Sequence, residues 1–295
     1  MKTKTCNKLM AMFLVLSLSA VLLSGCEFHA SFGIGNYVTG ESYPDSEAYQ
    51  TGAFTYEAET VKSIEIYWRS GEVEIIESES AELSARESGG ELPEEIAIHY
   101  LLEDGALKIR FCESGALINV HPNDKRLTIE VPNGIDISIH VTSAAVKADI
   151  LEQNSILISA HSGNTEIGTA EAENIDLSSS SGSIRADSIS AQTLKCNTSS
   201  GSVRIDDLEA ETADMDTSSG DVELVLVAAS QVDIHTSSGK TSLQLPEGGA
   251  EISYTASSGK LYTDEHFERK GDLYVFGSGE SRITVSSSSG NLEIQ

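Results

Sequence analysis

The sequence predicts an all-β protein whose main part is a parallel β-solenoid with coils of about 19 residues. The first observation is a repeated Ser-Gly pair, whose glycine recurs with a constant step of 19 residues at Gly163, Gly182, Gly201, Gly220 and Gly239. The second is an alternation of apolar and polar residues on both sides of each pair, which places one side of a strand in a core. No helical periodicity lies between the pairs. Repeats this short indicate stacked units, because one unit cannot bury its apolar face alone.

Two apolar blocks flank each of these marker glycines. The block before Gly182 contains Ile175 and Leu177, and the block after Gly201 contains Val203 and Ile205. Some repeats add a third apolar residue, expected to point inward, seven positions after the glycine: Ile189, Leu208 and Val227. The Ser-Gly run between the blocks is typical of a turn, where glycine is expected to supply backbone angles that a Cβ forbids.

Further copies of the pair end at Gly71, Gly259 and Gly290, and a degenerate copy ends at Ala144. An antiparallel β-sandwich also has many short strands at even spacing, so it stays the alternative architecture. A sandwich does not require the same residue at the same place in each unit, whereas stacked turns do. We expect a right-handed coil, because parallel crossovers are overwhelmingly of that hand. Equivalent residues of successive coils should then lie about 4.8 Å apart.

Residues 1–25 are predicted to be an export signal peptide, with three lysines before an apolar run from Leu9 to Leu23. That run is short for a membrane helix, which needs about 20 apolar residues. The following Leu23-Ser24-Gly25-Cys26 resembles the lipobox of bacterial lipoproteins, in which the cysteine becomes the lipidated first residue. Cys26 is therefore the predicted membrane anchor, on the extracytoplasmic face of the cell membrane. Removal of the signal peptide would change the net charge from −27 to −30, which makes nucleic acid a poor partner.

Residues 26–53 have no convincing period and are predicted to be a tether. Residues 54–131 are predicted to form an N-terminal β cap, and residues 132–295 the repeats. In the cap, two alternating runs meet at Asp104-Gly105, which is among the strongest local signals of a β-hairpin. Such a cap would protect the open end of a solenoid.

The lipobox, the Asp-Gly hairpin, the Leu127-Thr128-Ile129-Glu130-Val131-Pro132 segment and the recurring Ser-Ser-Gly-x-Val/Ile-x-Ile units together resemble a bacterial family of candidate adhesins built on β-strand repeats. The resemblance covers residues 54–295. It implies a β-repeat fold and a place in the cell envelope, and it brings no catalytic residues. Similar domains accompany envelope-stress sensing operons as well as cell-surface proteins. The interval from Gly259 to Gly290, 31 residues instead of 19, departs from the regular stack.

Chemistry-bearing residues do not form a recognisable site in the sequence. Asp187, Asp206 and Asp207 could stack as paired carboxylates for acid–base catalysis or Ca²⁺, but mixed charges along neighbouring rows favour a solvated surface. The seven histidines share no repeat position, and Cys196 falls at an inward position expected for a small buried thiol. The prediction is therefore no enzyme, no cofactor and no metal site.

The sequence favours a lipid-anchored surface binding or adhesion module, whose partner is an envelope protein or a glycan. An accessory regulator of envelope-stress signalling is the first alternative, and a polysaccharide-active enzyme is the second. A partner contact is predicted in the irregular segment 263–279, at His266, Phe267, Arg269 and Lys270, because insertions in repeat arrays often lie on the binding face. The alternative is that Leu273, Val275 and Phe276 fold back as a strand that seals the last coils.

Overall fold

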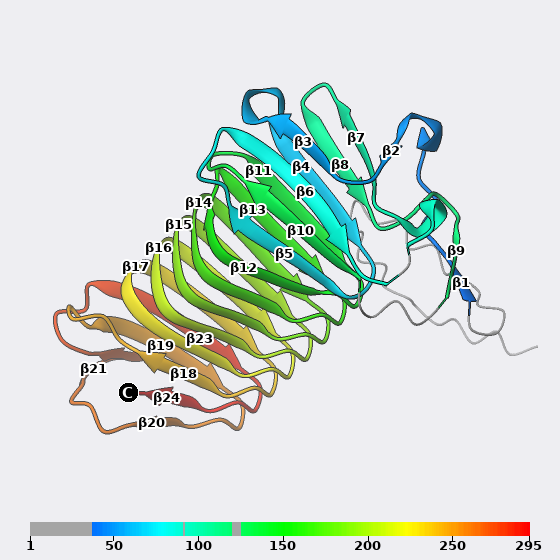
Figure 1. Cartoon of the computed structure of the whole chain (residues 1–295). Coiled ribbons are helices and arrows are strands. Elements are labelled where there is room, and N and C mark those ends of the chain that lie inside the picture. Colours follow the sequence, from blue (N-terminus) through cyan, green and yellow to red (C-terminus); the bar gives the residue numbers. More distant parts are fainter. Residues whose placement is uncertain (1–36, 91, 120–124) are drawn as a thin grey trace, which may run out of the picture.

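The computed structural model describes residues 37–90, 92–119 and 125–295, and these residues are almost entirely β-structure (Figure 1). The helices in these ranges are three single turns: Ser46–Ala48, Ala58–Thr60 and Glu94–Ile96. None of them is long and apolar enough to cross a membrane. The predicted signal peptide and Cys26 lie outside the described residues.

Four long strands form the regular centre of the array: β14 (Thr165–Ser179), β15 (Ile184–Thr198), β16 (Val203–Thr217) and β17 (Val222–Thr236). They pair in parallel and in chain order, with Thr165 opposite Ile184 and Ile184 opposite Val203, an offset of 19 residues. Figure 1 shows them side by side, stacked in chain order. The preceding strands β11 (Asp136–Val141), β12 (Ala145–Glu152) and β13 (Ser155–Ala160) join the same parallel stack. The all-β, mostly parallel prediction is confirmed, and the antiparallel sandwich is not observed.

The core is a set of stacked inward side chains. Ile175, Leu177 and their equivalents in the next coils, Leu194 and Cys196, are essentially inaccessible to water. Val227 is different: its side chain is 45% exposed, whereas Leu226 is 2% exposed. The predicted inward position of Val227 is therefore wrong. The cause is a β-bulge in β17, where Leu208 lies opposite Leu226 and the 19-residue register shifts locally.

The marker glycines of the regular coils are required for a different reason from the one expected. They have no positive φ; among the markers only Gly71 does, at 85°. Instead, a Cβ built on Gly201 would lie 1.9 Å from the carbonyl oxygen of Gly182 in the preceding coil. Close approach of stacked backbones, rather than an unusual backbone angle, selects glycine at these turns.

The N-terminal strands are β3 (Phe54–Glu57), β4 (Ser63–Trp68), β5 (Glu72–Glu77), β6 (Glu82–Ser88), β7 (His99–Glu103), β8 (Ala106–Arg110) and β10 (Arg126–Val131). β4 pairs in parallel with β11, and β5 pairs in parallel with β12, so the first coil of the array lies inside the segment assigned to the cap. β7 and β8 form the predicted hairpin, whose turn residues Asp104 and Gly105 have positive φ angles of 52° and 88°. Two short pairings complete this end: β1 (Tyr37–Thr39) with β9 (Leu117–Asn119), and β2 (Gln50–Thr51) with β7.

The C-terminal strands do not stack in chain order. They are β18 (Thr241–Gln244), β19 (Ala250–Ala256), β20 (Leu261–Thr263), β21 (Glu268–Lys270), β22 (Leu273–Val275), β23 (Ser281–Ser287) and β24 (Leu292–Ile294). β23 lies between β17 and β19, and β24 lies between β18 and β20. The last coil of the sequence is thus inserted into the stack. The extra residues form an antiparallel hairpin, β21–β22, that adds to β19 and buries Val275 and Phe276.

Candidate functional site

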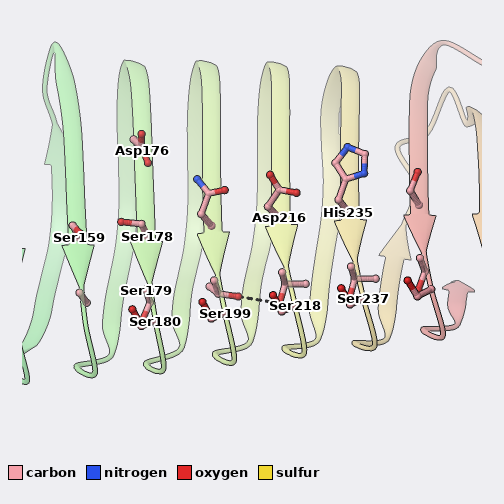
Figure 2. A pocket seen from close by; sticks show the side chains of 18 of the residues that line it. Ser159, Asp176, Ser178, Ser179, Ser180, Ser199, Asp216, Ser218, His235 and Ser237 are labelled. Carbon is pink, nitrogen blue, oxygen red and sulfur yellow. Dashed lines mark hydrogen bonds between the residues drawn. The ribbon is translucent and has the colours of Figure 1, made fainter. Parts of the chain in front are cut away.

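A polar groove of about 1000 Å³ crosses one face of the array (Figure 2). Side chains of β13 to β17, β19 and β23 line it, together with those of the turns that follow β14 to β17 and β23. One row of lining residues stands four positions before each marker glycine: Ser159, Ser178, Asn197, Asp216, His235, Ser286 and Thr255. The lining residues two positions before the glycine form a second row and are all serine: Ser180, Ser199, Ser218, Ser237 and Ser288.

The strand register aligns these side chains. Ser178 lies opposite Asn197, and Asn197 lies opposite Asp216. His235 continues the row between Asp216 and Ser286. Parallel strands hold such neighbours about 4.8 Å apart, so the groove presents a hydroxyl, an amide, a carboxylate and an imidazole at regular intervals.

The wall beneath the groove is held by an inward row of threonines. The hydroxyl of Thr198 donates to that of Thr217 at 3.1 Å. The backbone N–H of Gly220 donates to Thr217 Oγ1, and that of Gly239 donates to Thr236 Oγ1, each at 3.0 Å. The two bonds from Gly220 and Gly239 fix the turns that carry the serine row, because each ties a turn N–H to a strand side chain.

The outward row itself has unused hydrogen-bonding capacity. Within the described part of the chain, the side chains of Ser178, Asn197, Asp216 and His235 make no hydrogen bond or ion pair with protein groups. His235 is thus bonded neither to Asp216 nor to a serine, and the groove lacks the hydrogen-bonded relay that activates a serine nucleophile. Partial burial raises the pKa of Asp176 at the groove wall, an effect that Lys195 opposes. The arrangement is suited to binding a ligand that offers many hydroxyl or amide groups.

Two of the three carboxylates considered for catalysis are paired with arginines, whereas Asp207 forms no ion pair within the described residues. Asp206 accepts from Arg185 and from Arg204, each at 2.7 Å, and Asp187 lies 3.3 Å from Arg185. No three His, Cys, Asp or Glu side chains in the described ranges converge as metal ligands would. Both Cys112 and Cys196 are buried, as expected of small apolar groups, and this burial raises the pKa of the Cys196 thiol to about 12 and that of Cys112 to about 11.

The predicted contact residues gather at the C-terminal end of the array. His266, Phe267, Arg269 and Lys270 are all exposed, and they come from β21 and the residues just before it. The Phe267 ring lies 5.4 Å from that of Tyr274, and the Arg269 guanidinium lies 5.1 Å from the same ring. Lys270 lies 3.7 Å from Glu268. Their role in partner contact remains a prediction, whereas the burial of Val275 and Phe276 shows that the strand after them folds back on the coils.

Sequence reasoning missed the polar groove. The serine run is explained by turn chemistry alone, and the alternation pattern says nothing of which outward residues face a common groove. The available signal was the row itself, because Ser, Asn, Asp, His and Thr occupy one outward position without an aliphatic exception.

The family profile described as Toastrack DUF4097 matches residues 61–295. A solved structure described as a candidate lipid-binding protein from Parabacteroides distasonis is 18% identical, with a TM-score of 0.51 over 83% of this chain and 97% of that chain. Two structures described as candidate adhesins, from Parabacteroides distasonis and Bacteroides fragilis, are 12% and 15% identical, with TM-scores of 0.48 and 0.47. Each alignment covers 83% of this chain and 97% of the other. No curated protein matches the sequence.

Proposed function

This chain belongs to the Toastrack DUF4097 family. We propose that it is a lipid-anchored binding or adhesion module on the extracytoplasmic face of the cell membrane. The observation that carries the proposal is the polar groove, a row of unpartnered polar side chains that crosses neighbouring coils. The proposal includes no catalytic step, because Asp206, the best-placed carboxylate for such a step, is held in ion pairs by Arg185 and Arg204. It also includes a right-handed coil and an N-terminal end capped by the antiparallel strands β3, β6 and β7.

The ligand class that fits the groove best is a linear envelope glycan. Its hydroxyl and amide groups can both donate and accept, as can the serines and Asn197 along the groove wall. Each well-made hydrogen bond contributes about 0.5–1.5 kcal/mol, so useful affinity requires several in a row. A ladder that repeats with every coil supplies them without any one deep pocket.

Capture from cell envelopes tests the groove. The full-length protein should retain envelope glycan, and a variant with both Ser199→Arg and Ser218→Arg should retain about tenfold less, a loss of about 1.4 kcal/mol, because two long side chains fill the groove. Thr169→Arg places the same side chain on an exposed position outside the groove and should leave capture unchanged. Equal capture by the double variant would remove the groove from the binding site. If capture is abolished when the envelope is digested with protease, but not when its glycans are digested, the partner is a protein.

The anchor is tested separately. Cys26→Ala should abolish fatty-acid labelling and release the protein from the membrane fraction, because stable attachment takes two or more acyl chains. Labelling that persists in the variant would contradict the lipobox assignment.

A further inference from the structure

A second groove, here called the acidic groove, lies where β17 leaves the regular register. It has a volume of about 1030 Å³ and an apolar floor made by Val225, Val227, Leu245 and Pro246 together with neighbouring alanines. Five exposed carboxylates line it: Asp207, Glu209, Glu211, Glu247 and Glu280. No lysine or arginine is among its lining residues.

The apolar floor is a local departure from the repeat. After Gly201 the coil reads Ile205-Asp206-Asp207-Leu208-Glu209, with acids at the outward positions. After Gly220 it reads Leu224-Val225-Leu226-Val227-Ala228, five apolar residues in succession. Only alternate residues are needed for the core, and the bulge turns Val227 outward. Val227 thereby joins Val225, Leu245 and Pro246 in one apolar floor, and contiguous apolar surface of this kind is a feature of contact sites.

The carboxylates around this floor have no cationic partner within the described residues, whereas some others on the array do. Asp206 and Glu223 are held by arginines at 2.7 Å. In the part of the chain that the structure describes, the five groove carboxylates form no ion pair, and Glu280 alone accepts a hydrogen bond, from Ser278 at 3.1 Å. Unbalanced like charges around an apolar surface produce a negative potential that favours a cationic, partly apolar partner.

We propose that the acidic groove binds an extended protein segment that carries lysine or arginine side chains and at least one aliphatic side chain. Val227 and Pro246 would contact the aliphatic group, and the carboxylates would pair with the cations. A single metal ion fits less well, because in the described ranges these carboxylates do not converge as a ligand set would. This site is separate from the polar groove, with which it shares no lining residue.

The array provides a matched control for the charge contribution. Glu171 and Glu173 occupy the same coil positions as Glu209 and Glu211, two coils earlier, and all four are exposed. The earlier pair lines neither groove. Neutralising either pair therefore removes the same charge from the same kind of surface, and only one pair belongs to the proposed site.

The test measures binding of a fluorophore-labelled heptapeptide of alternating Lys and Val to the full-length protein by fluorescence anisotropy. We expect saturable binding that Glu209→Gln with Glu211→Gln weakens about fivefold, because each exposed ion pair contributes about 0.2–1 kcal/mol. Val227→Ser should weaken it by a similar factor, and a peptide with Ser in place of Val should bind the parent less tightly. Glu171→Gln with Glu173→Gln should change binding by less than about twofold. Equal weakening by the two glutamate pairs, or no effect of either, would overturn the proposal, because binding would then not depend on the groove.

Discussion

At the scale of single residues, the glycines of this chain show that one residue type can satisfy two different requirements. At Gly71 and Gly105 the chain adopts positive φ, which a side chain disfavours. At Gly182, Gly201 and Gly220 the backbone angles are ordinary, and the constraint is the carbonyl oxygen of the glycine one coil before. Stacked coils approach so closely at this corner that a single methyl group has no space.

Gly201→Ala should therefore destabilise the array although alanine tolerates the backbone angles. The new Cβ would lie 1.9 Å from Gly182 O, so two coils must separate at the turn. We expect a loss of about 2 kcal/mol or more in the free energy of unfolding, which denaturant titration measures. Gly90→Ala is the control, because a Cβ added at Gly90 would meet no atom within 4 Å and the φ of Gly90 is not positive. A Gly201→Ala variant as stable as the Gly90→Ala variant would contradict the close-approach argument.

At the scale of elements, a buried ion pair joins the N-terminal strands. Lys125 directly precedes β10, and its ammonium lies 2.8 Å from Glu87 of β6; both side chains are more than nine-tenths buried. The ammonium also donates to the carbonyl oxygens of Ile96 and Phe111 and lies 4.2 Å from the Phe111 ring. One cation thus connects three segments that are distant in the sequence.

Glu87→Gln should cost about 3–5 kcal/mol, because it leaves the Lys125 cation buried without its counter-charge. The double variant Glu87→Gln with Lys125→Met should recover much of that stability. Burial lowers the pKa of Lys125 and Glu87 opposes this shift, so loss of Glu87 lowers that pKa further. Burying the charged ammonium costs nothing once Lys125 is neutral in the folded and the unfolded protein. The stability that Glu87→Gln loses relative to the parent should therefore shrink as pH rises toward the ordinary lysine value of 10.5. Thermal unfolding across alkaline pH measures this effect, and a deficit independent of pH would contradict it.

At the scale of the whole molecule, the chain returns to the interior of its own stack. β23 and β24 separate β17–β18 from β19–β20, so the last residues of the sequence are held on both sides by earlier coils. Val232 lies opposite Ile283, a pairing across 51 residues, whereas neighbouring coils pair across 19. The C-terminal coils therefore depend on contacts that form only when the end of the chain is present.

Removal of residues 281–295 should consequently unfold more than the strands it deletes. β19 and β20 lose β23 and β24, their parallel partners, and we expect hydrogen-exchange protection to disappear from β19 to β22 while β14 to β16 keep theirs. Replacement of residues 264–269 by a Gly-Asn turn is the control, because it shortens the β21–β22 hairpin and leaves the inserted coil in place. Protection of β19 that survives the truncation would mean that this strand docks directly on β17.

The sequence by itself determined the all-β class, the 19-residue step, the buried identities of Leu177 and Cys196 and the hairpin at Asp104-Gly105. These are properties of one coil or one turn, and they are set by the local alternation of apolar residues and by the glycines at the turns. The sequence also contains the outward residues four positions before the marker glycines, but these line a groove only because the parallel strand register places them next to one another. The tertiary structure alone decided the inserted position of β23 and β24, the outward turn of Val227 and the burial of Lys125 against Glu87. The physical reason is that each depends on a partner that is distant in the sequence, and equivalent coils present such similar surfaces that periodicity cannot specify which of them are neighbours.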